Sequence, residues 1–340
     1  MKYLVYASLI ISGASVAQDV PENAISAISA ISAISAIKAD KTLLTDITNT
    51  GNGLIAVGKH GTVIKSDTGN KWQQAELVPT QVLLTAVDFS DENNGWACGH
   101  DATIINTTDG GINWQLQQVK PELDKPCLDI LFEDDLKGFA VGAYGMFYQT
   151  TDGGKHWQKR FLDSLLFSDD RDYLNDLKEN DPEGYEAETA SILPHFNRIE
   201  KTDNGLMLVG EMGLMARSID DGQTWQRIEE IYPGSFFAVA SDSTQEIVAG
   251  LRGNVFAKKN NEQEWLHFEN IKTATINNII NYNDKQWLML ANSGVIFHIQ
   301  DGLLTHEQLA DGKAILDGVI LNNKLIMATE DGIKVKELTP

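Results

Sequence analysis

Residues 209–225 read Val-Gly-Glu-Met-Gly-Leu-Met-Ala-Arg-Ser-Ile-Asp-Asp-Gly-Gln-Thr-Trp, and this stretch decides the fold. Related stretches occupy 57–72, 98–114 and 141–157, and a weaker copy ends at Trp265. Their final tryptophans are separated by 42, 43, 68 and 40 residues. Self-similarity at a period of about 40 to 50 residues indicates a β-propeller or a solenoid, in which each repeat is one supersecondary unit.

Each repeat reads as four short strands joined by Gly, Asn and Asp turns, which is typical of antiparallel blades. In the second repeat the strands are expected at 83–89, 95–98, 103–107 and 114–117. Seven such units follow one another, at 41–79, 81–120, 126–162, 193–230, 234–270, 273–304 and 312–338. We therefore expect an all-β fold, a seven-bladed β-propeller of four-stranded antiparallel blades over 41–338.

The last unit has room for only three strands, at 314–320, 324–329 and 332–338. A propeller leaves no open edge when one terminus pairs into the blade of the other. The segment 18–40 contains an Ile-Ser-Ala repeat, and we expect Ile25 to Ile37 to supply the outer strand of the seventh blade. The alternative is that this tract is a low-complexity linker.

One insertion, 163–192, breaks the period between the third and fourth units. Leu165, Leu166, Tyr173, Leu174 and Leu177 show helical spacing within it, so we expect a helical excursion over one face. Long loops on a rigid scaffold often carry function. A solvated acidic loop is the alternative.

The first seventeen residues have the features of a secretory signal peptide. Lys2 is a minimal basic region, 4–11 is apolar, and small residues precede a cleavage site after Ala17. We expect a periplasmic or secreted protein without a transmembrane segment in the mature chain, since no later apolar run approaches about 18 residues. The net charge of −21 argues against nucleic-acid binding.

The two cysteines, Cys98 and Cys127, lie in neighbouring repeats. Export and an even count permit a disulfide between them. The alternative is a pair of buried thiols that act as small apolar side chains.

The most regular motif is Asp-x-Gly-x-x-Trp. It occurs as Asp67-Gly69-Trp72, Asp109-Gly111-Trp114, Asp152-Gly154-Trp157 and Asp220-Gly222-Trp225. Asp can bond loop amides, Gly permits a positive φ, and Trp can pack between blades. Four copies in regular phase indicate scaffold, because a catalytic residue need occur only once.

These motifs resemble the Asp-box (BNR) repeat of sialidases and many secreted propellers. Together with the preceding Val-Gly-x-x-Gly, they are similar to the photosystem II stability and assembly factor family and its relatives in non-photosynthetic bacteria. The resemblance covers roughly 41–338 and implies a seven-bladed, non-enzymatic assembly factor that binds a membrane-protein partner. It makes an envelope complex, such as a transporter, the expected partner.

Sialidase or glycan-binding activity is the alternative from another class. Sialidases hold a sugar carboxylate with an arginine triad, next to a Tyr nucleophile, a Glu and an Asp acid. Here the arginines are scattered over expected strands, a turn and the insertion, at Arg160, Arg171, Arg198, Arg217, Arg227 and Arg252. The sequence therefore does not assemble the triad, and we expect no enzyme activity.

The turns between the second and third strands differ from blade to blade and are free to specialise. We expect a partner- or ligand-binding ring there, against the alternative of ordinary polar turns. Its predicted members are Lys59, His60, His100, Asp101, Tyr144, Glu211 and Arg252, with His195, Phe196 and Phe236 at first-strand starts. His60 and His100 with Asp101 or Glu211 give only a weak metal signal. We expect a monomer without a cofactor.

Overall fold

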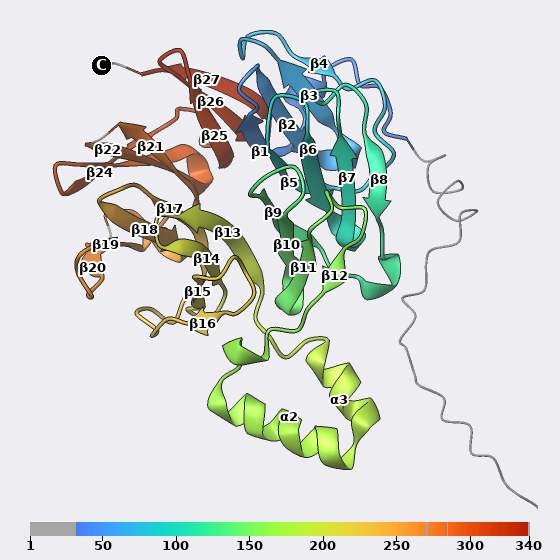
Figure 1. Cartoon of the computed structure of the whole chain (residues 1–340). Coiled ribbons are helices and arrows are strands. Elements are labelled where there is room, and N and C mark those ends of the chain that lie inside the picture. The colour runs from blue at the N-terminus through green and yellow to red at the C-terminus, as the bar shows by residue number, and fades with distance from the viewer. Residues whose placement is uncertain (1–31, 270, 284, 339–340) are drawn as a thin grey trace, which may run out of the picture.

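Seven antiparallel sheets follow one another around a ring in the computed structural model of the chain, which describes residues 32–269, 271–283 and 285–338 (Figure 1). Six sheets have four strands and the seventh has three. Within each blade the strands pair in chain order, so each blade is a simple meander from the inner to the outer strand. The expectation of a seven-bladed β-propeller is confirmed.

The strand bounds of the first four blades are as follows. Blade 1 contains β1(Leu44–Asn49), β2(Leu54–Gly58), β3(Val63–Ser66) and β4(Gln73–Gln74), and blade 2 contains β5(Leu84–Phe89), β6(Gly95–Gly99), β7(Thr103–Thr107) and β8(Gln115–Gln118). Blade 3 contains β9(Cys127–Phe132), β10(Gly138–Gly142), β11(Met146–Thr150) and β12(Gln158–Lys159), and blade 4 contains β13(Phe196–Thr202), β14(Gly205–Gly210), β15(Met215–Ser218) and β16(Gln226–Arg227).

The remaining three blades have these bounds. Blade 5 contains β17(Phe236–Ser241), β18(Gln245–Gly250), β19(Val255–Lys259) and β20(Leu266–Phe268), and blade 6 contains β21(Ile276–Asn283), β22(Gln286–Ala291), β23(Val295–Gln300) and β24(Leu303–Gln308). Blade 7 contains β25(Ile315–Leu321), β26(Lys324–Thr329) and β27(Gly332–Glu337).

Blade 7 has no fourth strand among the described residues. Residues 32–37 form no strand and lie along blade 1, where the Ala33 N–H donates to the Val78 carbonyl at 2.8 Å and Gln74 Nε2 donates to the Ile34 carbonyl at 3.1 Å. Residues 32–37 therefore do not supply the outer strand of blade 7, and the prediction is wrong for this part of the segment. Residues 25–31 of that prediction, and the signal peptide, lie outside the described residues.

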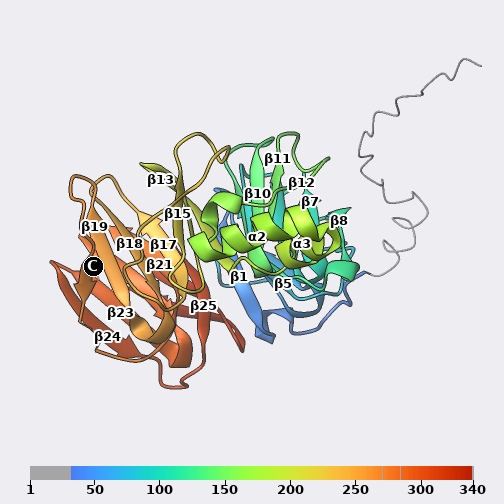
Figure 2. The same cartoon turned by 90° about the horizontal axis from the view of Figure 1, so that it is seen from below.

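The insertion is helical, as its leucine spacing predicts. It contains α2(Ser168–Asn180) and α3(Pro182–Thr189), which lie side by side and project from the junction of blades 3 and 4 (Figures 1 and 2). It is more than a solvated loop, because Leu165, Leu166 and Leu174 are buried in one core with Phe147 and Trp225 of the two blades. Burial of these side chains anchors the helical pair to the propeller.

The Asp-box loops are scaffold, and blade 2 shows how they work. The Gly111 amide donates to Thr107 Oγ1 at 3.1 Å, the Asn113 amide donates to Asp109 Oδ1 at 2.9 Å, and Trp114 Nε1 donates to the Gly111 carbonyl at 3.1 Å. The loops of blades 3 and 4 repeat the bonds made by Thr107 and Asp109, with Thr150 and Asp152 in blade 3 and with Ser218 and Asp220 in blade 4.

The first copy of the box departs from this pattern. Its loop is one residue shorter, so Ser66, rather than the residue two places before the Asp, accepts the Gly69 amide at 2.9 Å. Asp67 is exposed, whereas Trp72 Nε1 still donates to the Gly69 carbonyl at 3.1 Å. The bond between the tryptophan and its glycine is thus the part of the motif that the shorter loop of blade 1 keeps.

Candidate functional site

The predicted ring residues lie on one face of the propeller. Each first strand begins opposite the end of the second strand, as Leu44 does opposite Gly58. First-strand starts and the turns between second and third strands therefore share a face, which we call the turn face. The insertion between β12 and β13 enters β13 at the same face.

Six of the seven turns hold a non-glycine residue in the left-handed region, with φ between 53° and 59°. These residues are His60, Asp101, Tyr144, Met212, Arg252 and Ser293. Such a backbone costs a non-glycine residue about 1 kcal/mol or more, and it is most unusual for a bulky side chain. Residues that persist in this conformation cluster at binding sites. Here, however, the same backbone recurs in six blades, blade 6 included, as a two-residue hairpin turn requires, so it belongs to the scaffold. What differs from blade to blade is the side chain that each turn presents.

Blades 3 and 4 bring several of these residues into contact. The ring of Tyr144 packs edge-on against His195 with centroids 4.6 Å apart, and His195 Nδ1 lies 3.5 Å from a carboxylate oxygen of Glu211. Lys125 lies over the Tyr144 ring at 5.7 Å. Tyr144 is 46% exposed and Met212, beside Glu211, is 57% exposed. This sector is the largest contact cluster among the predicted residues.

Two predicted site residues are corrected by their burial. Phe196 and Phe236 are fully buried in the cores between blades, so they face neither solvent nor a ligand. Their place at the start of a first strand is inward-facing, whereas the preceding residue His195 reaches the turn face. A one-residue phase error explains the difference, because side chains alternate along a strand.

The blade 1 and blade 2 members are separate surface residues. Lys59, His60 and His100 are exposed, and Asp101 is half-buried. In the described ranges no group of three or more His, Cys, Asp or Glu side chains is placed to hold a metal ion. In blade 7 the equivalent pair, Glu330 and Asp331, shares one cation, with Lys313 Nζ at 3.0 and 3.2 Å.

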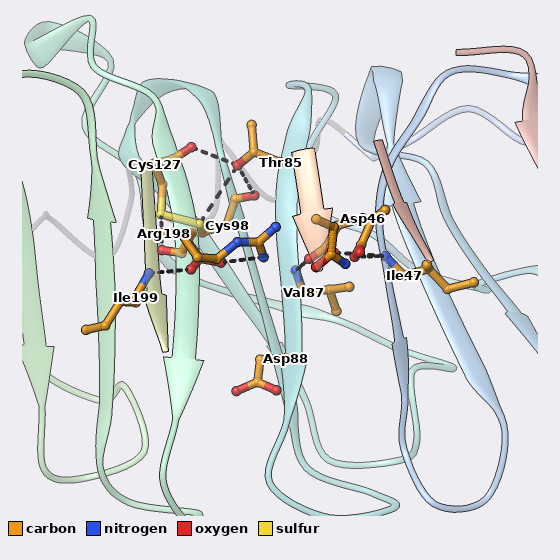
Figure 3. Close-up of polar contacts among 12 residues, drawn as sticks. Asp46, Ile47, Thr85, Val87, Asp88, Cys98, Cys127, Arg198 and Ile199 are labelled. Carbon is orange, nitrogen blue, oxygen red and sulfur yellow. Dashed lines mark hydrogen bonds and ion pairs between the residues drawn. A yellow bond between two sulfur atoms is a disulfide. The ribbon is translucent and has the colours of Figure 1, made fainter. Parts of the chain in front are cut away.

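A second cluster, absent from our sequence predictions, lies on the inner strands at the middle of the ring (Figure 3). Carboxylates of one blade accept backbone N–H groups of the next. Asp46 accepts Val87 at 2.6 Å, Asp88 accepts Phe132 at 2.7 Å, Asp129 accepts Ile199 at 2.8 Å, and Asp317 accepts Ile47 at 3.1 Å. These four contacts join blades 7, 1, 2, 3 and 4 in sequence.

The inner carboxylates are crowded, and their pKa values reflect it. Burial raises the pKa of Asp88 to about 7 and that of Asp129 to about 6. The backbone N–H bonds that each carboxylate accepts lower its pKa in part. Arg198, whose guanidinium lies 3.4 Å from Asp129, also lowers the pKa of Asp129. Burial and the nearby Asp129 raise the pKa of Glu200 to about 8. Burial, followed by Asp46, raises the pKa of Asp317. These groups bond inward to backbone amides, so we assign them to the scaffold.

The cysteines are joined in a disulfide, Cys98–Cys127, with Cα atoms 5.8 Å apart. It links β6 of blade 2 to the start of β9 in blade 3. Thr85 Oγ1 lies 3.0 Å from the Cys98 carbonyl and 2.7 Å from the Cys127 carbonyl, so it bridges the same junction (Figure 3).

Comparison with known proteins places the chain. A family model described as "Photosynthesis system II assembly factor YCF48" matches residues 64–125 and 115–306. The chain belongs to this family. A curated member, Photosystem II assembly protein Ycf48 of Synechococcus sp. (strain JA-3-3Ab), is 42% identical over 50 residues, which are 14% of this chain and 15% of that protein. The chain thus spans only about 15% of the length of the curated relative it matches.

Solved structures of the family share the fold. One, "YCF48 bound to D1 peptide", has a TM-score of 0.66 at 16% identity and covers 88% of this chain and 95% of that one. Another, YCF48 from Cyanidioschyzon merolae, has a TM-score of 0.65 at 16% identity and covers 90% and 98%. In the described part of this family member, no helix has the length and apolar character needed to cross a membrane.

Proposed function

We propose that the chain is an exported, monomeric, non-catalytic propeller that binds a membrane protein and helps to assemble or operate an envelope complex, a transporter being one candidate. One observation carries the proposal. Three successive blades place Tyr144, Met212 and Arg252 at the same turn position, exposed and in the left-handed conformation. The turn backbone recurs around the ring, whereas these three side chains are large, exposed and different from one another, so they are free to recognise a partner.

The residue types suit protein recognition. Tyr, Met and Arg are enriched in protein interfaces, and Tyr and Arg also dominate their energetic hot spots. The contact of Tyr144 with His195 and Lys125 holds the aromatic ring in place, which reduces the entropy lost on binding. The insertion reaches the same sector, because Lys125 Nζ donates to the Ala190 carbonyl just after α3. We propose that its acidic helical pair extends the contact towards basic residues of the partner.

The family relationship supports this proposal. A solved member of the fold carries a D1 peptide, so a propeller of this kind holds a segment of another protein. Transfer of that property to this chain rests on the family and on the turn face.

Export is supported by the cross-link between Cys98 and Cys127. Such bonds persist in the periplasm and outside the cell and are rare in a reducing cytosol. The proposed leader, residues 1–17, would deliver the chain to that compartment.

The arginines do not favour sialidase chemistry. Arg198 pairs with Asp129, Arg217 pairs with Glu246 at 2.8 Å, and Arg227 donates to the Leu165 carbonyl at 2.9 Å. Arg160 bonds two carbonyls of the blade 4 box loop, at Gly222 and Gln223. Side chains committed to separate strands and loops do not converge on one carboxylate.

The experiment is chemical crosslinking in intact cells that carry the full chain with a C-terminal tag, followed by mass spectrometry of the captured envelope proteins. We expect one dominant membrane-protein partner. A glycan bound on an array, together with the absence of any enriched protein, would overturn the proposal in favour of carbohydrate recognition.

Glycine variants separate binding from folding. Met212→Gly and Arg252→Gly remove the exposed side chain and also the left-handed strain, so thermal stability should stay close to that of the unmodified chain. Capture of the partner should fall at least about tenfold, as expected for loss of a hot-spot side chain. Ser293→Gly makes the same backbone change in blade 6 and should leave capture unchanged.

A further inference from the structure

The interface between blades 5 and 6 differs from the earlier ones because blade 6 has no Asp-box. In its place β23 and β24 are joined by the short turn Asp301-Gly302. In blades 2, 3 and 4 the box loop packs on the blade before it. Trp225 lies 5.8 Å from Phe147 of blade 3, Trp114 shares a core with Ile55 of blade 1, and Trp157 Nε1 donates to Gln117 of blade 2.

An open slot of about 370 Å³ lies where the missing loop of blade 6 would meet blade 5. Its apolar lining comes from both blades: Ala257, Leu266 and Phe268 of blade 5, and Trp287 and Ile299 of blade 6. Leu266 is 65% exposed at the rim, whereas Trp287 is almost fully buried and forms the floor. Volumes of this size are at the lower end of those found for ligand pockets.

The apolar lining sets this slot apart from another groove of the rim. The groove between blades 4 and 5 is lined by polar and charged side chains, with Ile219 as its one large apolar side chain. Charged and polar side chains line the rest of the slot between blades 5 and 6, namely Lys259, Glu262, Lys285, Gln245 and Asp301. Of these, Gln245 and Asp301 offer hydrogen-bond acceptors beside the apolar wall. An apolar wall with a few acceptors matches the needs of an indole ring, which has one N–H donor.

We propose that this slot binds an aromatic side chain, tryptophan by preference, from an extended segment of a protein partner. Tryptophan is the proposed occupant because Trp72, Trp114, Trp157, Trp225 and Trp265 fill the box position of the first five blades. The partner's side chain would take the place of the box tryptophan that blade 6 lacks. Tyr144, Met212 and Arg252 do not line this slot. Binding of an aromatic side chain in the slot can therefore be tested separately from the partner binding proposed for the turn face.

The test uses 5-fluoroindole and the full chain, with binding followed by fluorine NMR line broadening. We expect saturable binding with a Kd on the order of 1 mM, the affinity open to a ligand of this size. Leu266→Glu should weaken binding at least about fivefold, because it replaces apolar contact by a charge.

Leu303→Glu is the matched control. Leu303 is 69% exposed on β24 but does not line the slot, whereas the next residue, Leu304, packs against the core of blades 5 and 6. Binding should be unchanged in this variant, and both variants should keep the circular dichroism and melting temperature of the unmodified chain. Equal losses in the two variants, or no saturable binding by the unmodified chain, would overturn the proposal.

A diazirine-bearing indole gives a second measurement. After illumination of the full chain, the label should map by mass spectrometry to peptides that contain residues 245–302. Labelling confined to blades 1–4 would show that the ring binds elsewhere and would equally overturn the assignment.

Discussion

The side chain of Asp46 and the backbone of Val87 are joined across the first blade junction, with a donor–acceptor distance of 2.6 Å. Asp46 lies on the inner strand of blade 1 and Val87 on that of blade 2. The same carboxylate also accepts the amide of Ile47, which in turn is shared with Asp317 of blade 7. Asp46 and Asp317 together thus connect three consecutive blades.

Replacing this aspartate should separate its hydrogen bonds from its charge. Asp46→Ala leaves the Val87 amide without its acceptor inside the ring, and we expect a loss of about 1–3 kcal/mol in the free energy of unfolding. Urea denaturation followed by tryptophan fluorescence measures the change. Asp46→Asn keeps an acceptor and removes repulsion with the neighbouring carboxylates, so it should cost much less. An equal cost for both variants would contradict the hydrogen-bond explanation.

Stability should fall as pH rises from about 5 to 8. The pKa values of Asp88, Asp129 and Glu200 are raised to about 7, 6 and 8, above those of an unfolded chain near 4. The folded state therefore holds more protons over this range, and each deprotonation costs stability. Melting temperatures measured by calorimetry across the range would show the slope.

The Glu200→Gln variant provides the control for that slope, because it removes a group whose pKa is raised to about 8 and should flatten the upper end of the profile. Below pH 4 the opposite trend should appear. Bonds from Thr224 and Ser218 lower the pKa of Asp220 to about 2, so its contribution is lost as pH falls through that value. Stability that rises steadily from pH 5 to 8 would show that the inner carboxylates are not held as described.

Removing the disulfide should destabilise the junction of blades 2 and 3. The bond closes a loop with a sequence separation of 29, for which chain entropy gives about 3–4 kcal/mol. We expect Cys98→Ala combined with Cys127→Ala to lower the free energy of unfolding by roughly this amount, measured in urea. Addition of Thr85→Val should cost more in the double variant than in the oxidised chain, since the Thr85 hydroxyl bridges the same strands.

The helical pair should depend on one buried leucine. Leu174 is 3% exposed and packs in the core shared with blades 3 and 4. Leu174→Ala should cost about 2–5 kcal/mol, and limited proteolysis should then cut first within the insertion. Tyr173→Ala is the neighbouring control, because Tyr173 is 48% exposed. Equal protease sensitivity in the two variants would argue that the helices are not anchored through this core.

The repeat made the architecture predictable, while the exceptions to it were less so. The box residues and the spacing of Trp114, Trp157 and Trp225 predicted the blades and the phase of the turns, because the same local bonds recur in each copy. The position of 32–37 was not predictable from its composition, since a period of three favours no regular element. Phe196 and Phe236 were assigned to the surface because periodicity alone does not locate the bulge that sets their phase.

The inner carboxylates escaped prediction for a different reason. Asp46, Asp88, Asp129 and Asp317 lie on different repeats and only three of them occupy the same strand position, because Asp88 stands two residues further along. In sequence each is a single acidic residue in an apolar strand. Only closure of the ring brings the carboxylates together, so the signal is tertiary.

The three-stranded seventh blade gives the described ring a seam. Blades 7 and 1 meet through side-chain contacts such as that of Asp317 with the Ile47 amide, and in the described residues no strand from one end of the chain pairs with a strand from the other. Named strands of different blades pair at no junction of the described ring, but the chain itself links blades 1 to 7 in order, so the joint of blades 7 and 1 depends on non-covalent contacts. A partner that inserts between blades 7 and 1 would therefore have to break only non-covalent contacts, whereas the junction of blades 2 and 3 is also held by the disulfide. The described propeller is a ring that can open at one place.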